Sequence, residues 1–145
     1  MGDYDALRPI ERERLERFAA AFEDVDPLDY EQFAGTTASD DEIELARAVV
    51  LRAIGSGSRR SAVQRAVGAF TDAASRGIAR RWRGIDLLLG FTPSSIRVDD
   101  RVRLRESLER AVAAVVLWDE LTETERAALL GPWAPIAERA VVGGP

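Results

Sequence analysis

The chain has 145 residues, of which 46% are hydrophobic and 31% are charged, and its net charge is −5. This length and composition match one ordinary globular domain with a sizeable core, and they exclude a largely disordered protein. The chain contains no Cys, no His and no Lys, so all 20 basic residues are Arg. Disulfides, thiol catalysis and histidine chemistry are therefore excluded, and an enzyme would depend on carboxylates, Arg, Tyr and hydroxyl groups.

The N-terminus has no apolar region of the kind that a secretory signal requires. Met1 is followed directly by Gly2, Asp3, Tyr4 and Asp5. The longest apolar run, residues 111 to 118, is much shorter than the roughly 18 residues that cross a bilayer. We therefore expect no secretory signal, no membrane span and a cytoplasmic location.

A first helix is predicted to begin at Pro9, because Pro is well tolerated at the first helical position and Glu11 follows in the first turn. Its apolar residues recur at helical spacing and define one face, which consists of Leu15, Phe18, Ala19, Phe22 and Val25. Asp26-Pro27 then indicates a turn or a short helix.

A second helix is predicted after Ser39, which with Glu42 has the spacing of a capping box. Gly55 ends this helix, and residues 55 to 58, Gly-Ser-Gly-Ser, resemble a flexible linker. The apolar stripe of the helix consists of Ile43, Ala46, Val49, Val50, Ala53 and Ile54.

Residues 59 to 89 are predicted to form one long helix of about 45 Å, because a single apolar stripe keeps its phase throughout. The following segment, residues 96 to 104, alternates like a small β-hairpin around Asp99-Asp100. We favour a helix there, because a two-residue turn prefers Gly and an isolated hairpin is marginal in water.

The stretch from Asp99 to Leu121 is predicted to be the central helix of the fold. Its residues 111 to 118 are apolar on every side, which is typical of a helix that is buried on every side. We expect Trp118 to be a core anchor. The inward stripe is predicted to consist of Leu104, Leu108, Ala111, Val112, Val115 and Trp118.

Two short helices are predicted after the central helix. Thr122 and Glu125 form a second capping box before a helix that Gly131-Pro132 ends, and residues 135 to 142 indicate a last helix. Together the segments predict an all-α fold: a single-domain helical bundle over residues 1 to 145, with four principal helices plus short helices.

Charge is distributed unevenly along the chain. Residues 1 to 57 contain 6 Arg and 14 acids, a net charge of −8, and residues 86 to 145 contain 7 Arg and 10 acids, a net charge of −3. Residues 58 to 85 contain 7 Arg and one acid, a net charge of +6. One face of the long helix there carries Arg65, Arg76, Arg80 and Arg83, which we call the arginine ridge. The ridge is either a binding face for phosphate, nucleic acid or an acidic partner, or a solvated face that the acidic first third balances.

Arg81 is predicted to project into the apolar stripe of its helix, where an unpaired charge is costly. Asp119 is predicted to lie on the buried side of the central helix, so an ion pair between the two would satisfy both. Alternatively, Arg81 lines a pocket and binds a ligand carboxylate or phosphate. Trp82 and Trp133 are either half-exposed interface residues or part of the core.

No metal site and no cofactor are expected. Asp40, Asp41 and Glu44 have a spacing that could hold Mg²⁺, but helix capping explains the same residues. The pairs Glu13-x-x-Glu16 and Glu106-x-x-Glu109 are interleaved with Arg, which favours surface ion pairs.

The sequence therefore favours a non-catalytic helical interaction or regulatory module, with another protein as its partner and no specific nucleic-acid binding. A homo-oligomer is compatible with it. The alternative is a helical small-molecule-binding protein, or a carboxylate-dependent hydrolase, with a pocket near Arg81. A large apolar pocket open to solvent beside Arg81 would favour this alternative, whereas a closed core with an exposed apolar patch would favour the module.

Overall fold

A computed structural model describes residues 7–23, 39–88 and 98–142. These ranges contain helices and no strand, which confirms the predicted all-α fold. None of the described helices combines the length and the apolar character needed to cross a membrane. The long helices are α1 (Pro9–Glu23), α3 (Asp40–Ile54), α4 (Ser58–Leu88) and α5 (Val98–Val116), and the short ones are η3 (Trp118–Glu120), α6 (Glu123–Leu130), η4 (Gly131–Trp133) and α7 (Ala134–Val141).

The helix boundaries follow the local signals in the sequence. The Thr122 hydroxyl accepts a hydrogen bond from the Glu125 amide (3.1 Å), and the Glu125 carboxylate accepts one from the Thr122 amide (2.9 Å), which completes the predicted capping box. Ser39 caps α3 by accepting from the Glu42 amide (3.2 Å). Gly55 ends α3 with a φ of 81°, a left-handed conformation that favours glycine.

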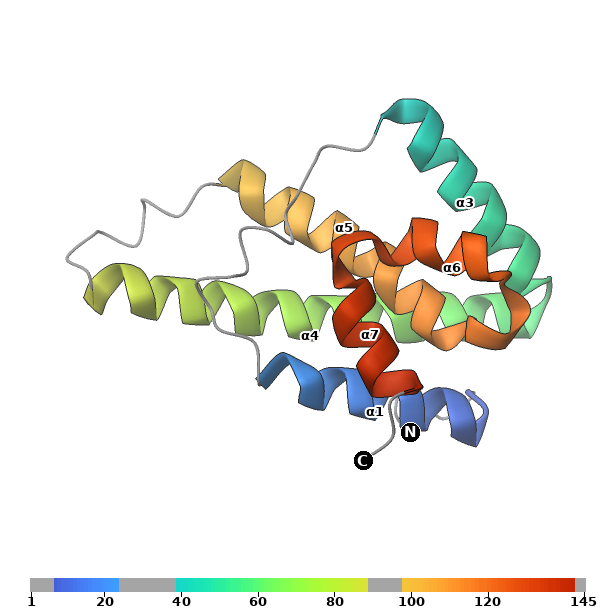
Figure 1. The fold of residues 1–145 in the computed structure, drawn as a ribbon, viewed down its shortest axis with the longest axis horizontal. Coiled ribbons are helices and arrows are strands. Elements are labelled where there is room, and N and C mark those ends of the chain that lie inside the picture. The colour runs from blue at the N-terminus through green and yellow to red at the C-terminus, as the bar shows by residue number, and fades with distance from the viewer. Residues whose placement is uncertain (1–6, 24–38, 89–97, 143–145) are drawn as a thin grey trace.

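α5 lies at the centre of the fold and contacts α1, α3, α4, α6, η4 and α7 (Figure 1). Each residue from Ala111 to Leu117 is at most 5% exposed, so the segment predicted to be buried on every side is buried on every side except at its last residue, Trp118. α4 packs most extensively against α5 and is one continuous helix of 31 residues, as predicted. The hairpin alternative is excluded for residues 98 to 104, because α5 begins at Val98.

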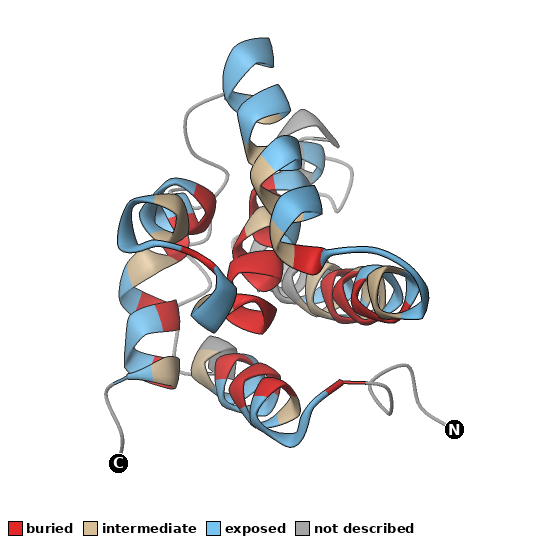
Figure 2. Cartoon of the chain, turned by 90° about the vertical axis from the view of Figure 1, so that its right-hand side faces the viewer, coloured by how far each residue is buried: buried red, intermediate tan, exposed pale blue. Residues whose placement is uncertain are grey.

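α3 is the most peripheral of the long helices. Ile54 is its one buried residue, and the rest of its apolar stripe is only partly buried against the core. Figure 2 shows buried residues on the facing sides of the other long helices, whereas α3 extends away from them with mostly exposed and intermediate residues. The Arg52 guanidinium also joins α3 to α6 through Glu125, at 2.5 Å. The apolar stripe predicted for α3 therefore faces the core, but the core buries it only in part.

The predicted positions of Trp118 and Asp119 are wrong, because the α-helix ends at Val116 and continues as the 3₁₀ turn η3. A 3₁₀ turn changes the angle between successive side chains, so the helical phase no longer applies there. Trp118 is only partly buried, and the Arg126 guanidinium lies 5.0 Å from its ring centroid in a cation–π contact. Asp119 has a side chain that is 58% exposed.

Trp133 takes the place in the core that was predicted for Trp118. It is fully buried, its ring meets the Phe18 ring edge to face at 6.5 Å, and its indole N–H donates to the Ser107 hydroxyl at 3.0 Å. Phe18 in turn stacks on Phe70 at 5.9 Å. Of the two alternatives for Trp133, core packing is confirmed.

Replacing Trp133 by Ala should lower the free energy of unfolding by about 3 to 5 kcal/mol, because it leaves a large cavity and an unpaired Ser107 hydroxyl. Replacing Trp118 by Ala should cost only about 1 to 2 kcal/mol, because this ring is partly solvated. Urea unfolding of both variants measures the difference. Equal losses for the two variants would contradict this assignment of the core tryptophan.

Candidate functional site

The arginine ridge lies on the solvent side of α4 as far as its side chains are described. Arg65, Arg76 and Arg80 are exposed, and none of the three is in an ion pair within the described ranges. Asp72, the acid of the same segment, is paired with Arg105 of α5. The ridge therefore presents guanidinium groups to solvent.

The ion pair predicted between Arg81 and Asp119 receives no support from the position of Asp119. Its carboxylate pairs with Nη2 of Arg14 at 2.5 Å, and the Arg14 side chain is only 8% exposed. Arg81, Trp82 and Arg83 belong to α4, but their side chains lie outside the described part of the structure. Their predicted contacts therefore stay predictions.

Glu11 is fully buried at the centre of a charged cluster with Arg8, Arg59 and Glu120. Its carboxylate accepts hydrogen bonds from Nη2 of Arg59 (2.7 Å), Nη2 of Arg8 (3.0 Å) and the Arg8 amide (2.9 Å). Arg8 also pairs with Glu120 at 2.5 Å. The cluster joins the start of α1 to the start of α4 and to η3.

The pKa of Glu11 shows that this carboxylate is held in its ionised form. Burial is the largest single influence and opposes ionisation, but the hydrogen bonds from Arg59, from the Arg8 side chain and from the Arg8 amide together outweigh it. They lower the pKa of Glu11 to about 2. A carboxylate with so low a pKa is a poor proton acceptor at neutral pH, so this cluster is suited to structure rather than to acid–base catalysis.

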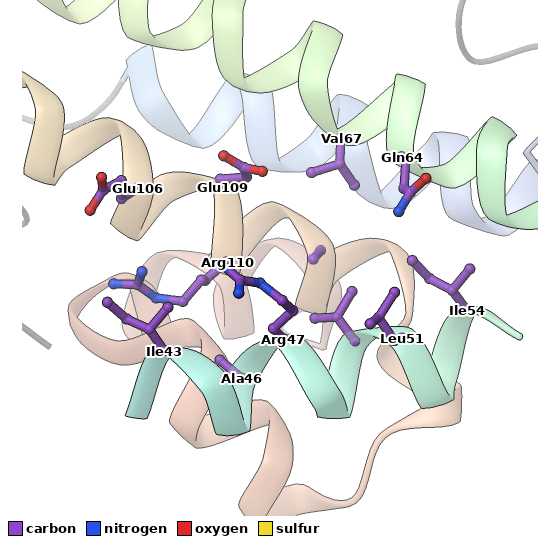
Figure 3. A pocket seen from close by; sticks show the side chains of 12 residues that line it. Ile43, Ala46, Arg47, Leu51, Ile54, Gln64, Val67, Glu106, Glu109 and Arg110 are labelled. Atoms are coloured by element: carbon purple, nitrogen blue, oxygen red, sulfur yellow. The ribbon is translucent and has the colours of Figure 1, made fainter. Parts of the chain in front are cut away.

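A cleft with a volume of about 520 Å³ lies between α3, α4 and α5 (Figure 3). We call it the α3 cleft. Its apolar lining comes from all three helices, and its charged lining comes from α3 and α5. The residues that line it are Ile43, Ala46, Arg47, Val50, Leu51, Ile54, Gln64, Val67, Glu106, Glu109, Arg110 and Ala113.

The two arginines of the α3 cleft approach it from opposite walls. Figure 3 shows Arg47 extending from α3 toward α5 and Arg110 extending from α5 toward α3. Arg47 pairs with Glu44 of its own helix at 2.9 Å. Arg110 is partly buried, and among the described residues it has neither an ion pair nor a hydrogen bond to its side chain. The cleft thus combines an apolar floor with one guanidinium that has no anionic partner.

The sequence predicted the helices that form these sites, but it did not predict the α3 cleft or the Glu11 cluster. The stripe of α3 was predicted, whereas the space left beneath it depends on how far α3 stands from α4 and α5. Arg8 and Glu11 have helix-start spacing, which is a local signal, but Arg59 is 48 residues from Glu11 in the sequence. No pattern in the sequence pairs residues at that separation.

Comparisons of the chain with known protein families, with curated proteins and with solved structures found no match. The described candidates are the arginine ridge, the Glu11 cluster and the α3 cleft. Of these, the α3 cleft is the one that is both hollow and open to a ligand.

Replacing Glu11 by Gln should lower the free energy of unfolding at pH 7 by about 3 kcal/mol and remove part of its dependence on pH. Because the pKa of Glu11 is about 2 when folded and near 4.5 when unfolded, the unfolded chain binds the proton first as the pH falls. The stabilisation is therefore complete above about pH 5 and is lost as the pH falls from about 4.5 to about 2.

Urea unfolding of wild type and of Glu11→Gln at several pH values between about 2 and 7 tests this. Glu13→Gln is the matched control, because Glu13 is 50% exposed and its one ion pair among the described residues is with Arg17 of the same helix. Its effect should stay below about 0.5 kcal/mol. A Glu11→Gln variant with wild-type stability and wild-type pH dependence would refute the structural role of the cluster.

Proposed function

We propose that the protein is a non-catalytic binding protein and that it holds a small, largely apolar molecule in the α3 cleft. The observation that carries this proposal is the cleft, with its volume of about 520 Å³ and a lining in which seven of the twelve residues are apolar. Clefts that bind small molecules have volumes of roughly 300 to 1,000 Å³, apolar walls and a few convergent polar groups.

Because of the α3 cleft, we favour a small-molecule-binding protein over the interaction module that the sequence alone favours. The sequence favours an interaction module and keeps a small-molecule pocket near Arg81 as the alternative. The α3 cleft supports a small-molecule pocket, but not at the predicted place near Arg81. Val67 lines the cleft, and Arg81 lies about 21 Å farther along α4 at the helical rise of about 1.5 Å per residue.

Binding without chemistry is supported by the side chains of the cleft. Among the described residues that line it, none carries a hydroxyl that could act as a nucleophile. Its two carboxylates, Glu106 and Glu109, belong to exposed residues of α5. Glu11, the enclosed carboxylate, does not line the cleft and is held ionised by two arginines.

The test fills the cleft without disturbing the core. Ala46 lines the cleft and is only partly buried, so Ala46→Trp should occupy its volume. Ala48 is exposed on the same helix and does not line the cleft, so Ala48→Trp is the matched control. Nile red, an uncharged apolar dye, should bind wild type and Ala48→Trp with enhanced fluorescence and should bind Ala46→Trp at least about tenfold more weakly, a difference of about 1.4 kcal/mol.

Circular dichroism and urea unfolding establish that each variant is folded. If Nile red does not bind wild type, or binds Ala46→Trp as tightly as wild type, the proposal is wrong. Mass spectrometry of small molecules released by organic solvent from the purified wild-type protein identifies a natural ligand. This ligand should be absent from Ala46→Trp and present in Ala48→Trp.

The interaction module is the second candidate, and it is favoured by Arg65, Arg76 and Arg80, which are exposed and form no ion pair within the described residues. Its partner would be an acidic protein surface, because the chain outside residues 58 to 85 carries a net charge of −11 and repels a long polyanion. We expect no submicromolar binding of labelled DNA or RNA in fluorescence anisotropy at about 0.15 M salt. Submicromolar binding that disappears when Arg65, Arg76, Arg80 and Arg83 are replaced by Ser would show that the ridge binds nucleic acid.

A further inference from the structure

We propose that Arg110 determines the ligand class of the α3 cleft, and that this ligand is an amphipathic monocarboxylate, with an apolar chain on the floor and a carboxylate on the Arg110 guanidinium. This inference rests on the proposed function, because it names the chemistry of the molecule that the same cleft would hold. It is carried by three features of Arg110: its position, its lack of a partner and the charges beside it.

Arg110 lies where the apolar floor meets solvent. It is partly buried on α5, and its side chain extends toward α3 over the cleft (Figure 3). A ligand whose apolar chain lies against Ile43 and Val50 would place its polar end near such a group. A guanidinium binds a carboxylate through two parallel hydrogen bonds, which fixes the orientation of the ligand as well as its charge.

The lack of a partner separates Arg110 from the other described arginines of α3 and α5. Arg47 pairs with Glu44, Arg52 with Glu125 and Arg105 with Asp72. Arg110 has Glu106 four residues before it, a spacing that favours an intrahelical ion pair, yet the described side chains make no such pair. Its guanidinium is therefore available to an anion from outside the chain.

The neighbouring charges favour a single negative charge on the ligand. Glu106 and Glu109 also line the cleft, so the four charged groups of its lining, two arginines and two glutamates, sum to zero. Arg47 is already paired with Glu44, which leaves one guanidinium without a partner. A carboxylate matches that one charge, whereas the second charge of a phosphate dianion would have no cationic partner and would roughly double the repulsion from the two glutamates.

The experiment displaces bound Nile red with three amphiphiles that share one alkyl chain: dodecanoate, dodecyl phosphate and dodecyltrimethylammonium, each below its critical micelle concentration. Wild type should release the dye at dodecanoate concentrations about tenfold lower than for either other compound, the size expected of one charge-assisted hydrogen-bonded pair. The net charge of −5 attracts dodecyltrimethylammonium and repels dodecanoate, so a preference for dodecanoate over that cation cannot come from the overall charge of the chain.

Arg110→Gln should weaken dodecanoate about tenfold more than it weakens Nile red, because the dye has no charged head group. Arg76→Gln is the matched control: it removes the same charge from an exposed residue that does not line the cleft, and it should change neither affinity. Circular dichroism verifies that both variants are folded.

Two results would overturn the inference while the proposed function stands. In the first, Nile red binds wild type but the three amphiphiles displace it equally, or dodecyl phosphate displaces it best. In the second, Arg110→Gln leaves dodecanoate unchanged. If Nile red does not bind wild type at all, the proposed function itself is wrong, and the inference fails with it.

Discussion

The fold depends on the need to bury the segment from Ala111 to Leu117 on every side. A helix that is apolar all round gains free energy only if other elements surround it, since each exposed face would leave apolar surface in water. α1, α4, α6, α7 and η4 meet this need by packing around α5, and Trp133 closes the core with its indole N–H satisfied by Ser107. The Glu11 cluster then joins the start of α1 to the start of α4, where apolar packing alone would leave the two helix starts unlinked.

α3 contributes less to the core than the other long helices, because those helices and the short ones already cover most of α5. Its stripe faces the core, but only Ile54 is buried, and the short side chains of Ala46 and Ala113 line the space between it and α5. Short side chains on facing walls leave volume that longer ones would fill. The α3 cleft thus results from the positions of large and small apolar residues on α3 and α5. Its polar end is formed by the charged residues of α5, which are Arg110 and the glutamates before it.

The sequence predicted the helices well because helices are encoded locally. The capping box at Thr122 and Glu125, the Pro9 start and the unbroken stripe of α4 each depend on residues a few positions apart, and each is confirmed. The prediction failed where the local geometry changed, as at Trp118 and Asp119, because the change from α-helix to 3₁₀ turn at the end of α5 has no strong signal in the sequence. The pairing of Arg59 with Glu11 and the α3 cleft depend on tertiary placement, which no local spacing encodes.

Arg110 has an explanation that needs no ligand, since a long arginine stem can cover apolar surface while its guanidinium stays in water. The two explanations make different demands on the side chain. If Arg110 only covers the floor of the α3 cleft, its aliphatic stem is sufficient, and the shorter stem of glutamine would partly replace it. The affinity for an amphiphile would then not depend on the head group of that amphiphile. Recognition of a carboxylate requires the guanidinium, and it requires that Glu106 and Glu109 leave it free. The described structure meets the second requirement, because Arg110 has no ion pair although two carboxylates lie within one turn of it on its own helix. Glu11 differs in this respect, because its two arginine partners leave it no free charge, whereas Arg110 has no ion pair among the described residues.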